Sequence, residues 1–409
     1  MGTDKKNVLV VAYACEPDKT SEPGVGWHFS LEISKSYNVT VLTRRNNKKS
    51  IETKEVDDRN YIYYDLPKFF KTLKKIIPLG TQLYYCCWQW GGYYYAKKQL
   101  KKTKLDIDLV HHLNFGVSWI APPAYLLRQP FIWGPIGGGD TVPWSFLKKM
   151  KLRWILQEFI YGSINRIGKA SPFSWMTRGK ASAVIFRTRS AQEIFPKRGN
   201  THTAIISETA SSDIVTHYPK KLETSIQAIC VGRMNYWKGF MLAVKGFEEF
   251  LKKGGKGTLE LFGEGTELNS IKTYIKSNQL ENHIFIRGFV PNETIKQKMS
   301  DAHVLLHASF REGGSWAIME AMSYGLPVVC LNTSGPKDMV TENCGILVNM
   351  HSEKQVVTDI GSALMSFTKD INRYENFSKN AIERIRQEYN WQRRGEQIGE
   401  IYKKVFISN

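Results

Sequence analysis

The stretch IQAICVGRMNYWKGFMLAVKGFEEFLKKGGKGTLELFGEG, residues 226–265, decides the fold of this chain. It predicts a buried strand at 226–234, an amphipathic helix at 240–254 and a second strand at 259–265. Strand, helix and strand in this order form one β-α-β unit, in which the two strands lie parallel. Continuous apolar runs of this kind are typical of strands that are covered on both faces. The sequence therefore predicts an α/β protein.

The same alternation continues on both sides of this stretch. Further strands are expected in the C-terminal half at 283–290, 302–309, 326–331 and 345–349, and in the N-terminal half at 7–14, 36–45, 105–113, 130–138 and 182–188, with a helix at 24–36. A chain of 409 residues exceeds the roughly 250–300 residues at which single cores stop growing. We therefore expect two Rossmann-like domains that face each other across a cleft, where such sheets bind ligands.

The predicted domains divide the chain near residue 217. The N-terminal domain takes residues 1–216 and is completed by about 391–409, the C-terminal domain takes 217–390, and the stretch at 217–225 is the linker. The C-terminal segment 391–406 is expected to be a helix that crosses back to the N-terminal domain.

The amino-acid composition excludes several classes of protein. With 42% hydrophobic and 23% charged residues, the chain is typical of a globular protein. Six cysteines without a C-x-x-C pair indicate neither a zinc site nor a disulfide framework. The chain shows no signal-peptide core and no apolar run near the length of about 18 that spans a membrane. These features predict a cytoplasmic protein.

Almost the whole net charge of +19 lies in two segments. Residues 66–104 carry nine lysines and no acid, and residues 145–190 carry ten Lys or Arg and the single acid Glu158. Aromatic and aliphatic residues are interleaved with these charges, a mixture that suits an anionic membrane surface. The alternative is amphipathic helices that bury their rings and solvate their lysines. No nucleic-acid-binding motif accompanies the charge, so nucleic acid is not an expected partner.

The segment SFREGGSWAIMEAM, residues 309–322, carries two acids eight positions apart, Glu312 and Glu320. Gly313, Gly314 and Ser315 follow the first acid and open a predicted helix. Free backbone N–H groups at such a helix start can bind an anion or hydroxyl oxygens. Two acids on an amphipathic helix, without any function, are the alternative interpretation.

The segment VGRMNYWKGF, residues 231–240, places Arg233 and Lys238 in the loop after a predicted strand. Two fixed cations can neutralise a diphosphate as it leaves, the task that a metal ion performs in other enzymes. The alternative is a solvated loop.

Together these segments resemble the family 4 (group 1) retaining glycosyltransferases. The first, followed by SYGLPVV at 323–329, resembles the E-x7-E motif, and the second resembles the family's G-R-x(n)-K-G segment. The resemblance implies the GT-B fold and a sugar transfer from a UDP or GDP sugar to a hydroxyl of a glycan or lipid-linked acceptor, with retention and without a metal or other cofactor. It also implies a role in bacterial cell-surface polysaccharide synthesis, such as capsule or lipopolysaccharide, with the enzyme on the inner face of the cell membrane.

The resemblance also assigns roles to residues. Glu312 would contact the donor sugar, Glu320 the ribose, and Arg233 and Lys238 the diphosphate. LFGEGTEL at 261–268 resembles the turn beside the phosphates, and RGFVPNETI at 287–295 resembles the strand end at the base. The remaining donor-binding residues are expected to be Gly232, Gly263, Gly265, Phe289, Val290, Gly313, Gly314, Ser315 and Trp316.

The acceptor side is expected in the N-terminal half. Residues 14–29 are predicted as a long loop between a strand and a helix. Gly24 and Gly26, near the N-terminus of that helix, would let the backbone approach a phosphate or the acceptor, with Asp18 and Glu22 nearby. The family often has a histidine after the fifth strand, where this chain has GPIGGG at 134–139. His111 and His112 are the nearest substitutes, and core histidines are the alternative. A non-catalytic binder of sugar nucleotides or polyanions with the same fold is the rival function.

Overall fold

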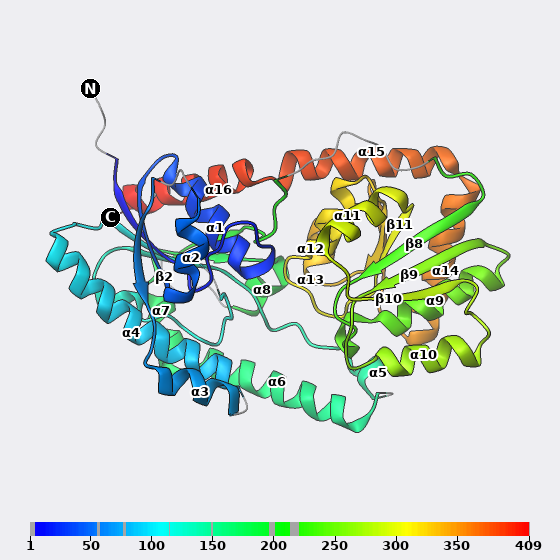
Figure 1. Ribbon diagram of the computed structural model, residues 1–409, viewed down its shortest axis with the longest axis horizontal. Coiled ribbons are helices and arrows are strands. Elements are labelled where there is room, and N and C mark those ends of the chain that lie inside the picture. Colours follow the sequence, from blue (N-terminus) through cyan, green and yellow to red (C-terminus); the bar gives the residue numbers. More distant parts are fainter. Residues whose placement is uncertain are drawn as a thin grey trace. The chain divides into compact units, whose positions relative to one another are not determined.

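The computed structural model describes residues 5–54, 58–76, 79–113, 115–148, 150–195, 201–212 and 221–408. The chain forms two compact units (Figure 1). The first comprises Met1–Gly139, Ser163–Glu208 and Trp391–Asn409, and the second comprises Asp140–Gly162 and Thr209–Asn390. Residues 140–162 and 209–212, which the sequence assigned to the N-terminal domain, thus belong to the second unit. Part of the expected linker, 217–220, lies outside the described residues.

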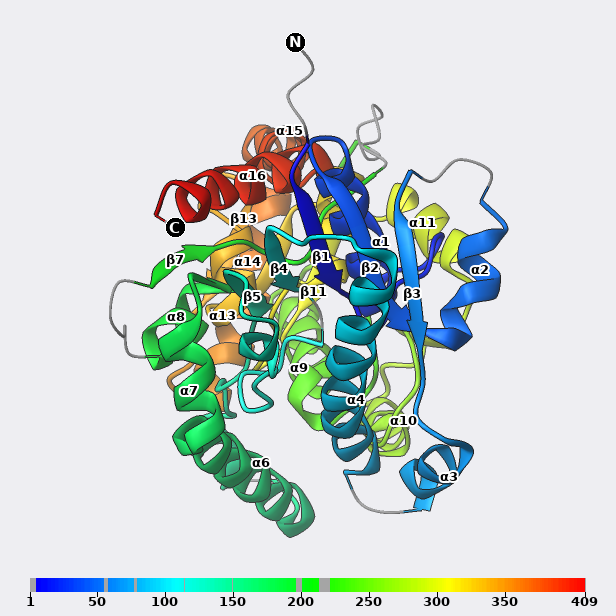
Figure 2. The same ribbon diagram turned by 90° about the vertical axis from the view of Figure 1, so that its left-hand side faces the viewer.

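The first unit is built on a seven-stranded parallel sheet (Figure 2). Its strand order is β3-β2-β1-β4-β5-β6-β7. The strands are β1 Asn7–Val11, β2 Asn38–Arg44, β3 Asn60–Tyr64, β4 Leu109–His112, β5 Phe131–Ile136, β6 Ala183–Phe186 and β7 His202–Ile205. The predicted strands are all present, and the sheet has in addition β3 and β7 at its two edges. These edge strands are only partly buried, so neither shows the continuous apolar run of an inner strand.

Helices cover both faces of this sheet. The helices of the unit are α1 Ser21–Ser34, α2 Lys48–Glu52, α3 Lys68–Ile76, α4 Gly80–Thr103, α7 Pro172–Lys180, α8 Arg189–Ile194 and α16 Trp391–Ser408, with short 3-10 turns η1 Arg45–Asn47 and η2 Ala124–Leu127. Leu9 and Val11 pack with Trp88 of α4, and Val8 and Val10 on the opposite face are equally buried.

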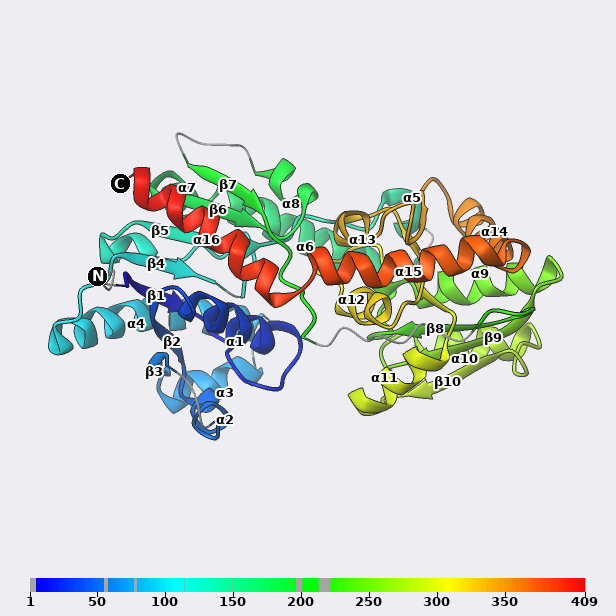
Figure 3. The same cartoon turned by 90° about the horizontal axis from the view of Figure 1, so that it is seen from above.

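The final helix completes the first unit, as predicted. Figure 3 shows α16 beside α1. Trp391 at its start stacks on His28 of α1 with 4.6 Å between ring centroids. Further along, the Tyr402 hydroxyl is 2.8 Å from His111 Nδ1 of β4.

The second unit is built on a six-stranded parallel sheet of order β10-β9-β8-β11-β12-β13. The strands are β8 Ser225–Val231, β9 Lys256–Phe262, β10 Ile284–Gly288, β11 Val304–His307, β12 Val328–Leu331 and β13 Gly345–Val348. Its helices are α5 Trp144–Leu147, α9 Phe240–Lys252, α10 Leu268–Ser277, α11 Asn292–Asp301, α12 Trp316–Ser323, α13 Ser334–Met339, α14 Glu353–Lys369 and α15 Ile371–Glu388, with the 3-10 turn η3 Tyr236–Lys238. α14 packs against α9, and α15 packs against α12.

Helix α6, Leu152–Ala170, contributes residues to both units. Its beginning and α5 join the core of the second unit through Phe146, Leu147 and Trp154. Across the described ranges, no helix has both the length and the apolar character that a bilayer crossing requires. The predicted α/β class with two Rossmann-like units is confirmed.

Candidate active site

The second unit has its topological switch point between β8 and β11. From β8 the strand order runs through β9 to β10 in one direction and through β11 to β13 in the other. Loops that leave the carboxyl ends of two such neighbouring strands diverge, and ligands bind in the crevice between them. The loop after β8 carries Arg233 and Lys238, and the loop after β11 carries Glu312. The topology thus brings the two sequence motifs together within one sheet.

Close backbone contacts fix the loop that carries Lys238. The loop ends in the turn η3, after which Gly239 adopts a φ of +63°. A Cβ atom at Gly239 would lie 1.9 Å from the Ala308 carbonyl oxygen, so only glycine fits there. The Phe310 amide donates a hydrogen bond to the Trp237 carbonyl at 2.8 Å. The Lys238 side chain therefore extends from a turn that is attached to the β11 loop.

Lys238 and Glu312 form an ion pair in this position. Both side chains are largely shielded from solvent, with 20% and 15% exposed. Burial by itself would raise the pKa of Glu312, but the Lys238 ammonium and His307 outweigh it and lower that pKa to about 2. Glu312 is therefore a carboxylate at neutral pH, and it can accept hydrogen bonds from sugar hydroxyls.

His307 is a site residue that the sequence interpretation missed. It is the last residue of β11, its Nε2 lies 3.6 Å from the Glu312 carboxylate, and the same atom lies 3.4 Å from Ser315 Oγ. A histidine that ends the strand before the E-x7-E segment was the available signal. Its imidazole can orient the carboxylate by a hydrogen bond.

Backbone packing shapes the glycine loop at the start of α12. The Gly335 amide donates to the Glu312 carbonyl at 2.9 Å, and a Cβ at Gly335 would lie 1.5 Å from the Gly313 carbonyl oxygen. Ser315 is the N-cap of α12, and its hydroxyl accepts from the Ile318 amide at 3.3 Å. The first amides of a helix in general have no acceptor one turn before them in the helix, and the N-terminal end of a helix favours a hydroxyl or an anion.

Glu320 lies further along α12, in a different electrostatic environment. Burial raises its pKa to about 7, and the nearby Lys296 offsets that rise only in part. The two acids of the motif thus differ: Glu312 is held ionised, whereas Glu320 exchanges its proton near neutral pH. Strongly shifted pKa values of this kind occur often at functional sites.

Glycines let the loops after β8 and β9 approach each other closely. Gly232 and Gly263 have φ values of +145° and +127°, and a Cβ at Gly263 would lie 1.9 Å from the Gly232 carbonyl oxygen. A Cβ at Gly265 would lie 2.5 Å from the Met234 carbonyl oxygen. The strand ends therefore present backbone rather than side chains, which suits the close approach of a phosphate.

The remaining expected donor residues line the same strand ends or the helix start. The Arg233 side chain is exposed, and the described residues offer it no ion pair. Phe289 is 82% exposed just after β10, whereas Val290 packs partly into the core. Trp316, the first residue of α12, is partly buried. An exposed cation and an exposed ring thus stand at the carboxyl edge of the sheet.

A buried acid from α6, Glu158, holds both loops. Its isolation among basic residues was the sole hint of this role in the sequence. Glu158 Oε1 accepts from the Tyr236 hydroxyl at 2.7 Å and lies 2.9 Å from the Arg311 guanidinium. The guanidinium also lies over the Tyr161 ring, 4.2 Å from its centroid. Since Tyr236 precedes Lys238 and Arg311 precedes Glu312, Glu158 positions the loops that carry the ion pair.

The expectations for residues 14–29 need correction. Helix α1 begins at Ser21, three residues earlier than expected. Gly24 and Gly26 do lie near its N-terminus, but they are buried within the helix and not in a loop before it. A Cβ at Gly24 would lie 2.0 Å from the Lys19 carbonyl oxygen, which explains this glycine by packing. Glu22 is held by Arg187 at 2.8 Å and by the Phe115 amide at 3.0 Å. Asp18 pairs with Lys54 on the surface.

His111 and His112 are core residues, contrary to the expectation of an acceptor role. Both are buried, and each imidazole has both nitrogens engaged. His111 lies 2.9 Å from the Gly134 carbonyl oxygen and contacts Tyr402, while His112 lies 2.8 Å from the Tyr85 hydroxyl and 3.0 Å from that of Tyr93. Burial lowers the pKa of His111 to about 4 and that of His112 to about 3.

Comparisons with known proteins agree with this architecture. The family model described as "Glycosyl transferases group 1" matches residues 217–384. Poly(glycerol-phosphate) alpha-glucosyltransferase of Bacillus subtilis is 28% identical over 158 residues, which are 38% of this chain and 23% of that protein. Amylovoran biosynthesis glycosyltransferase AmsK of Erwinia amylovora is 30% identical over 128 residues, 30% of this chain and 31% of that protein. The matches to the first relatives thus span less than half of their lengths.

Solved structures match over nearly the whole chain. HepE of Anabaena in complex with UDP superposes with a TM-score of 0.63 at 16% identity, covering 97% of this chain and 99% of that one. Sucrose-phosphate synthase from Thermosynechococcus elongatus gives a TM-score of 0.62 at 16% identity, covering 99% and 100%. At this identity the likeness concerns the fold. The chain thus has two Rossmann-like units of the GT-B type, and most of its second unit matches the group 1 glycosyl transferase family model.

Proposed function

We propose that the protein is a retaining glycosyltransferase that moves a hexose from a UDP or GDP sugar to a hydroxyl of a glycan or lipid-linked acceptor. The observation that carries the proposal is the shielded Lys238–Glu312 ion pair at the switch point of the second unit. It supplies a cation for the leaving phosphate and a carboxylate for the sugar beside it. The names of the relatives above, which concern cell-surface polymers, support an acceptor of that class.

In the proposed reaction, Arg233 and Lys238 neutralise the diphosphate while Glu312 and the backbone amides of residues 313–315 hold the sugar. Glu320 contacts the ribose. The bond between the anomeric carbon and the phosphate oxygen breaks, and the bond to the acceptor oxygen forms on the same face. The acceptor proton passes to the leaving phosphate. The protein's cations stabilise the developing negative charge, so the reaction needs no divalent metal.

The test is a panel of UDP and GDP sugars incubated with the protein in the presence of EDTA. We expect slow hydrolysis of one donor without an acceptor and faster turnover with one. Lys238→Ala and Glu312→Ala should each lower turnover by about 10²- to 10³-fold, as the loss of one preorganised electrostatic group does. Lys276→Ala, an exposed position on α10, is the matched control. Undiminished turnover in both site variants would refute the site, and binding of the donor without any turnover would identify a non-catalytic binder.

We also propose that the first unit binds the cytoplasmic surface of a membrane that contains anionic lipid. Lysines of α3 and α4 are largely exposed beside exposed apolar residues such as Phe69 and Tyr94. Lysine with exposed rings is the composition of an interfacial surface. Sedimentation with phosphatidylcholine vesicles, with and without phosphatidylglycerol, checks this, and equal sedimentation with both would contradict it.

A further inference from the structure

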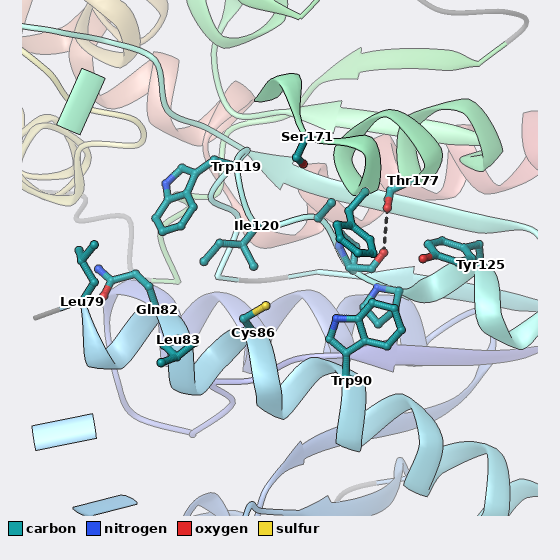
Figure 4. Close-up of a pocket in the computed structure, with 14 residues that line it drawn as sticks. Leu79, Gln82, Leu83, Cys86, Trp90, Trp119, Ile120, Tyr125, Ser171 and Thr177 are labelled. Atoms are coloured by element: carbon teal, nitrogen blue, oxygen red, sulfur yellow. Dashed lines mark hydrogen bonds between the residues drawn. The ribbon is translucent and has the colours of Figure 1, made fainter. Parts of the chain in front are cut away.

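The first unit contains an apolar cavity of about 440 Å³ to which none of the nucleotide-site residues contribute (Figure 4). It lies between α4, the segment 119–125 and α7. Figure 4 shows Leu83, Cys86 and Trp90 of α4 opposite Trp119 and Ile120. The volume falls within the roughly 300–1,000 Å³ of cavities that hold small ligands. The cavity is therefore large enough for a ligand of its own.

Two of the polar groups in the wall, the hydroxyls of Ser171 and Thr177, are hydrogen-bonded within the protein. The Thr177 hydroxyl donates to the Pro122 carbonyl at 3.1 Å, and the Ser171 hydroxyl accepts from the Ser174 amide at 3.2 Å. Burial raises the pKa of the Cys86 thiol, which stays neutral. The wall thus offers a ligand mainly carbon and sulfur, and it favours an apolar ligand.

The rim of the cavity is apolar and open to solvent. Leu79 and Leu83 are each 50% exposed, and Phe173 is 55% exposed. The Trp90 and Phe173 rings meet edge to face, 6.1 Å apart. Clustered exposed apolar side chains mark contact with another apolar phase or molecule.

Two lysines stand at the Tyr125 end of the cavity. Lys97 Nζ of α4 lies 3.4 Å from the Leu126 carbonyl oxygen, and Lys180 Nζ of α7 lies 5.2 Å from the centroid of the Tyr125 ring. Both residues are exposed, so their ammonium groups can meet an anion in solvent. The cavity therefore combines an apolar interior with a cationic end.

We propose that this cavity binds an aliphatic chain of an anionic membrane phospholipid, with the lipid phosphate facing Lys97 and Lys180. An aliphatic chain complements the apolar wall, and a phosphate complements the two ammonium groups. This proposal rests on the proposed membrane association. It differs in that the cavity binds one lipid chain specifically, in addition to the attraction of lysines to a charged surface. Captured lipid would anchor the first unit where a lipid-linked acceptor is found.

The first experiment titrates the protein with octyl, decyl and dodecyl phosphate monomers and follows heat release. We expect one molecule bound per chain, with about three- to fourfold tighter binding for each added methylene until the cavity is full. Ala121→Phe and Cys86→Phe fill the cavity and should each weaken dodecyl phosphate at least tenfold, with folding checked by circular dichroism. The double variant Lys97→Ala, Lys180→Ala should weaken every alkyl phosphate and remove the dependence on salt. The matched control is Lys101→Ala, Lys102→Ala.

The second experiment measures sedimentation of the same variants with vesicles of phosphatidylcholine and phosphatidylglycerol. We expect both cavity-filling variants to bind less than the native chain while they still hydrolyse the nucleotide sugar. Equal affinity of the filled variants for dodecyl phosphate, or no binding of any alkyl phosphate, would overturn the proposal. Binding of a prenyl phosphate without binding of a phospholipid would also overturn the proposal, because the cavity would then belong to the acceptor site. If the native chain hydrolyses no nucleotide sugar, that result refutes the proposed function and not the lipid cavity.

Discussion

Replacement of Glu320 by glutamine should make the protein more stable at alkaline pH and weaken nucleotide binding. The pKa of Glu320 is raised by burial from 4.5 to about 7 in the folded protein. Glu320 in the folded state therefore keeps its proton to a higher pH than in the unfolded chain. As a result, the free energy of unfolding falls as the pH rises from about 4.5 through about 7. A tenfold difference in proton affinity corresponds to about 1.4 kcal/mol, so ionised Glu320 destabilises the folded state by about 3 kcal/mol above pH 8.

Glutamine keeps the shape of the side chain and removes the charge. We expect Glu320→Gln to have nearly the free energy of unfolding of the native protein at pH 4.5, and to exceed it by about 2–3 kcal/mol at pH 8.5 because Glu320 is partly buried. The assay is urea unfolding across this pH range. The control is Glu342→Gln, at an exposed position of the same unit, which should change stability by less than about 0.5 kcal/mol at every pH.

The same variant should bind UDP at least about tenfold more weakly, since a hydrogen bond to a charged group contributes about 1.5–3 kcal/mol. A stability difference between Glu320→Gln and the native protein that does not grow with pH would refute the electrostatic reasoning. Unchanged UDP affinity would refute the ribose contact.

Three further predictions concern other parts of the chain. Glu158→Gln should lower the free energy of unfolding by about 2–4 kcal/mol and slow sugar transfer, because it removes the anion beside the largely shielded Arg311. Urea unfolding measures the first effect, and donor turnover measures the second. Gly335→Ala should abolish donor binding by displacing the glycine loop, whereas Gly162→Ala, at an open helical position, should leave binding intact and stabilise by up to about 1 kcal/mol. Because burial lowers the pKa values of the two β4 histidines to about 4 and about 3, stability should fall as pH drops from 6.5 toward 4, and thermal unfolding at several pH values checks this.

The sequence was sufficient to predict the inner strands, and it singled out two charged segments that the structure brings together. Both depend on local signals, namely apolar runs of strand length and glycines beside charged residues, and the structure places Lys238 and Glu312 together at neighbouring strand ends. Edge strands β3 and β7 were missed because half-burial weakens their apolar pattern.

Contacts between distant residues could not be predicted in the same way. The partner of Arg311 is Glu158, which lies far away in the sequence, and no local pattern indicates such a pair. The histidines of β4 were misassigned for a related reason. Their polar character suggested a site, but tyrosine hydroxyls from α4 and α16 satisfy them inside the core. Only the three-dimensional arrangement distinguishes a buried, satisfied imidazole from a reactive one.

The division of the chain between the units has a consequence for protein synthesis. Every residue of the second unit leaves the ribosome before α16 does, whereas the first unit needs α16 to place Tyr402 against His111. Nascent domains generally fold from the N-terminus onward. Here we expect the opposite order: the second unit folds while the first unit remains incomplete until α16 has been synthesised.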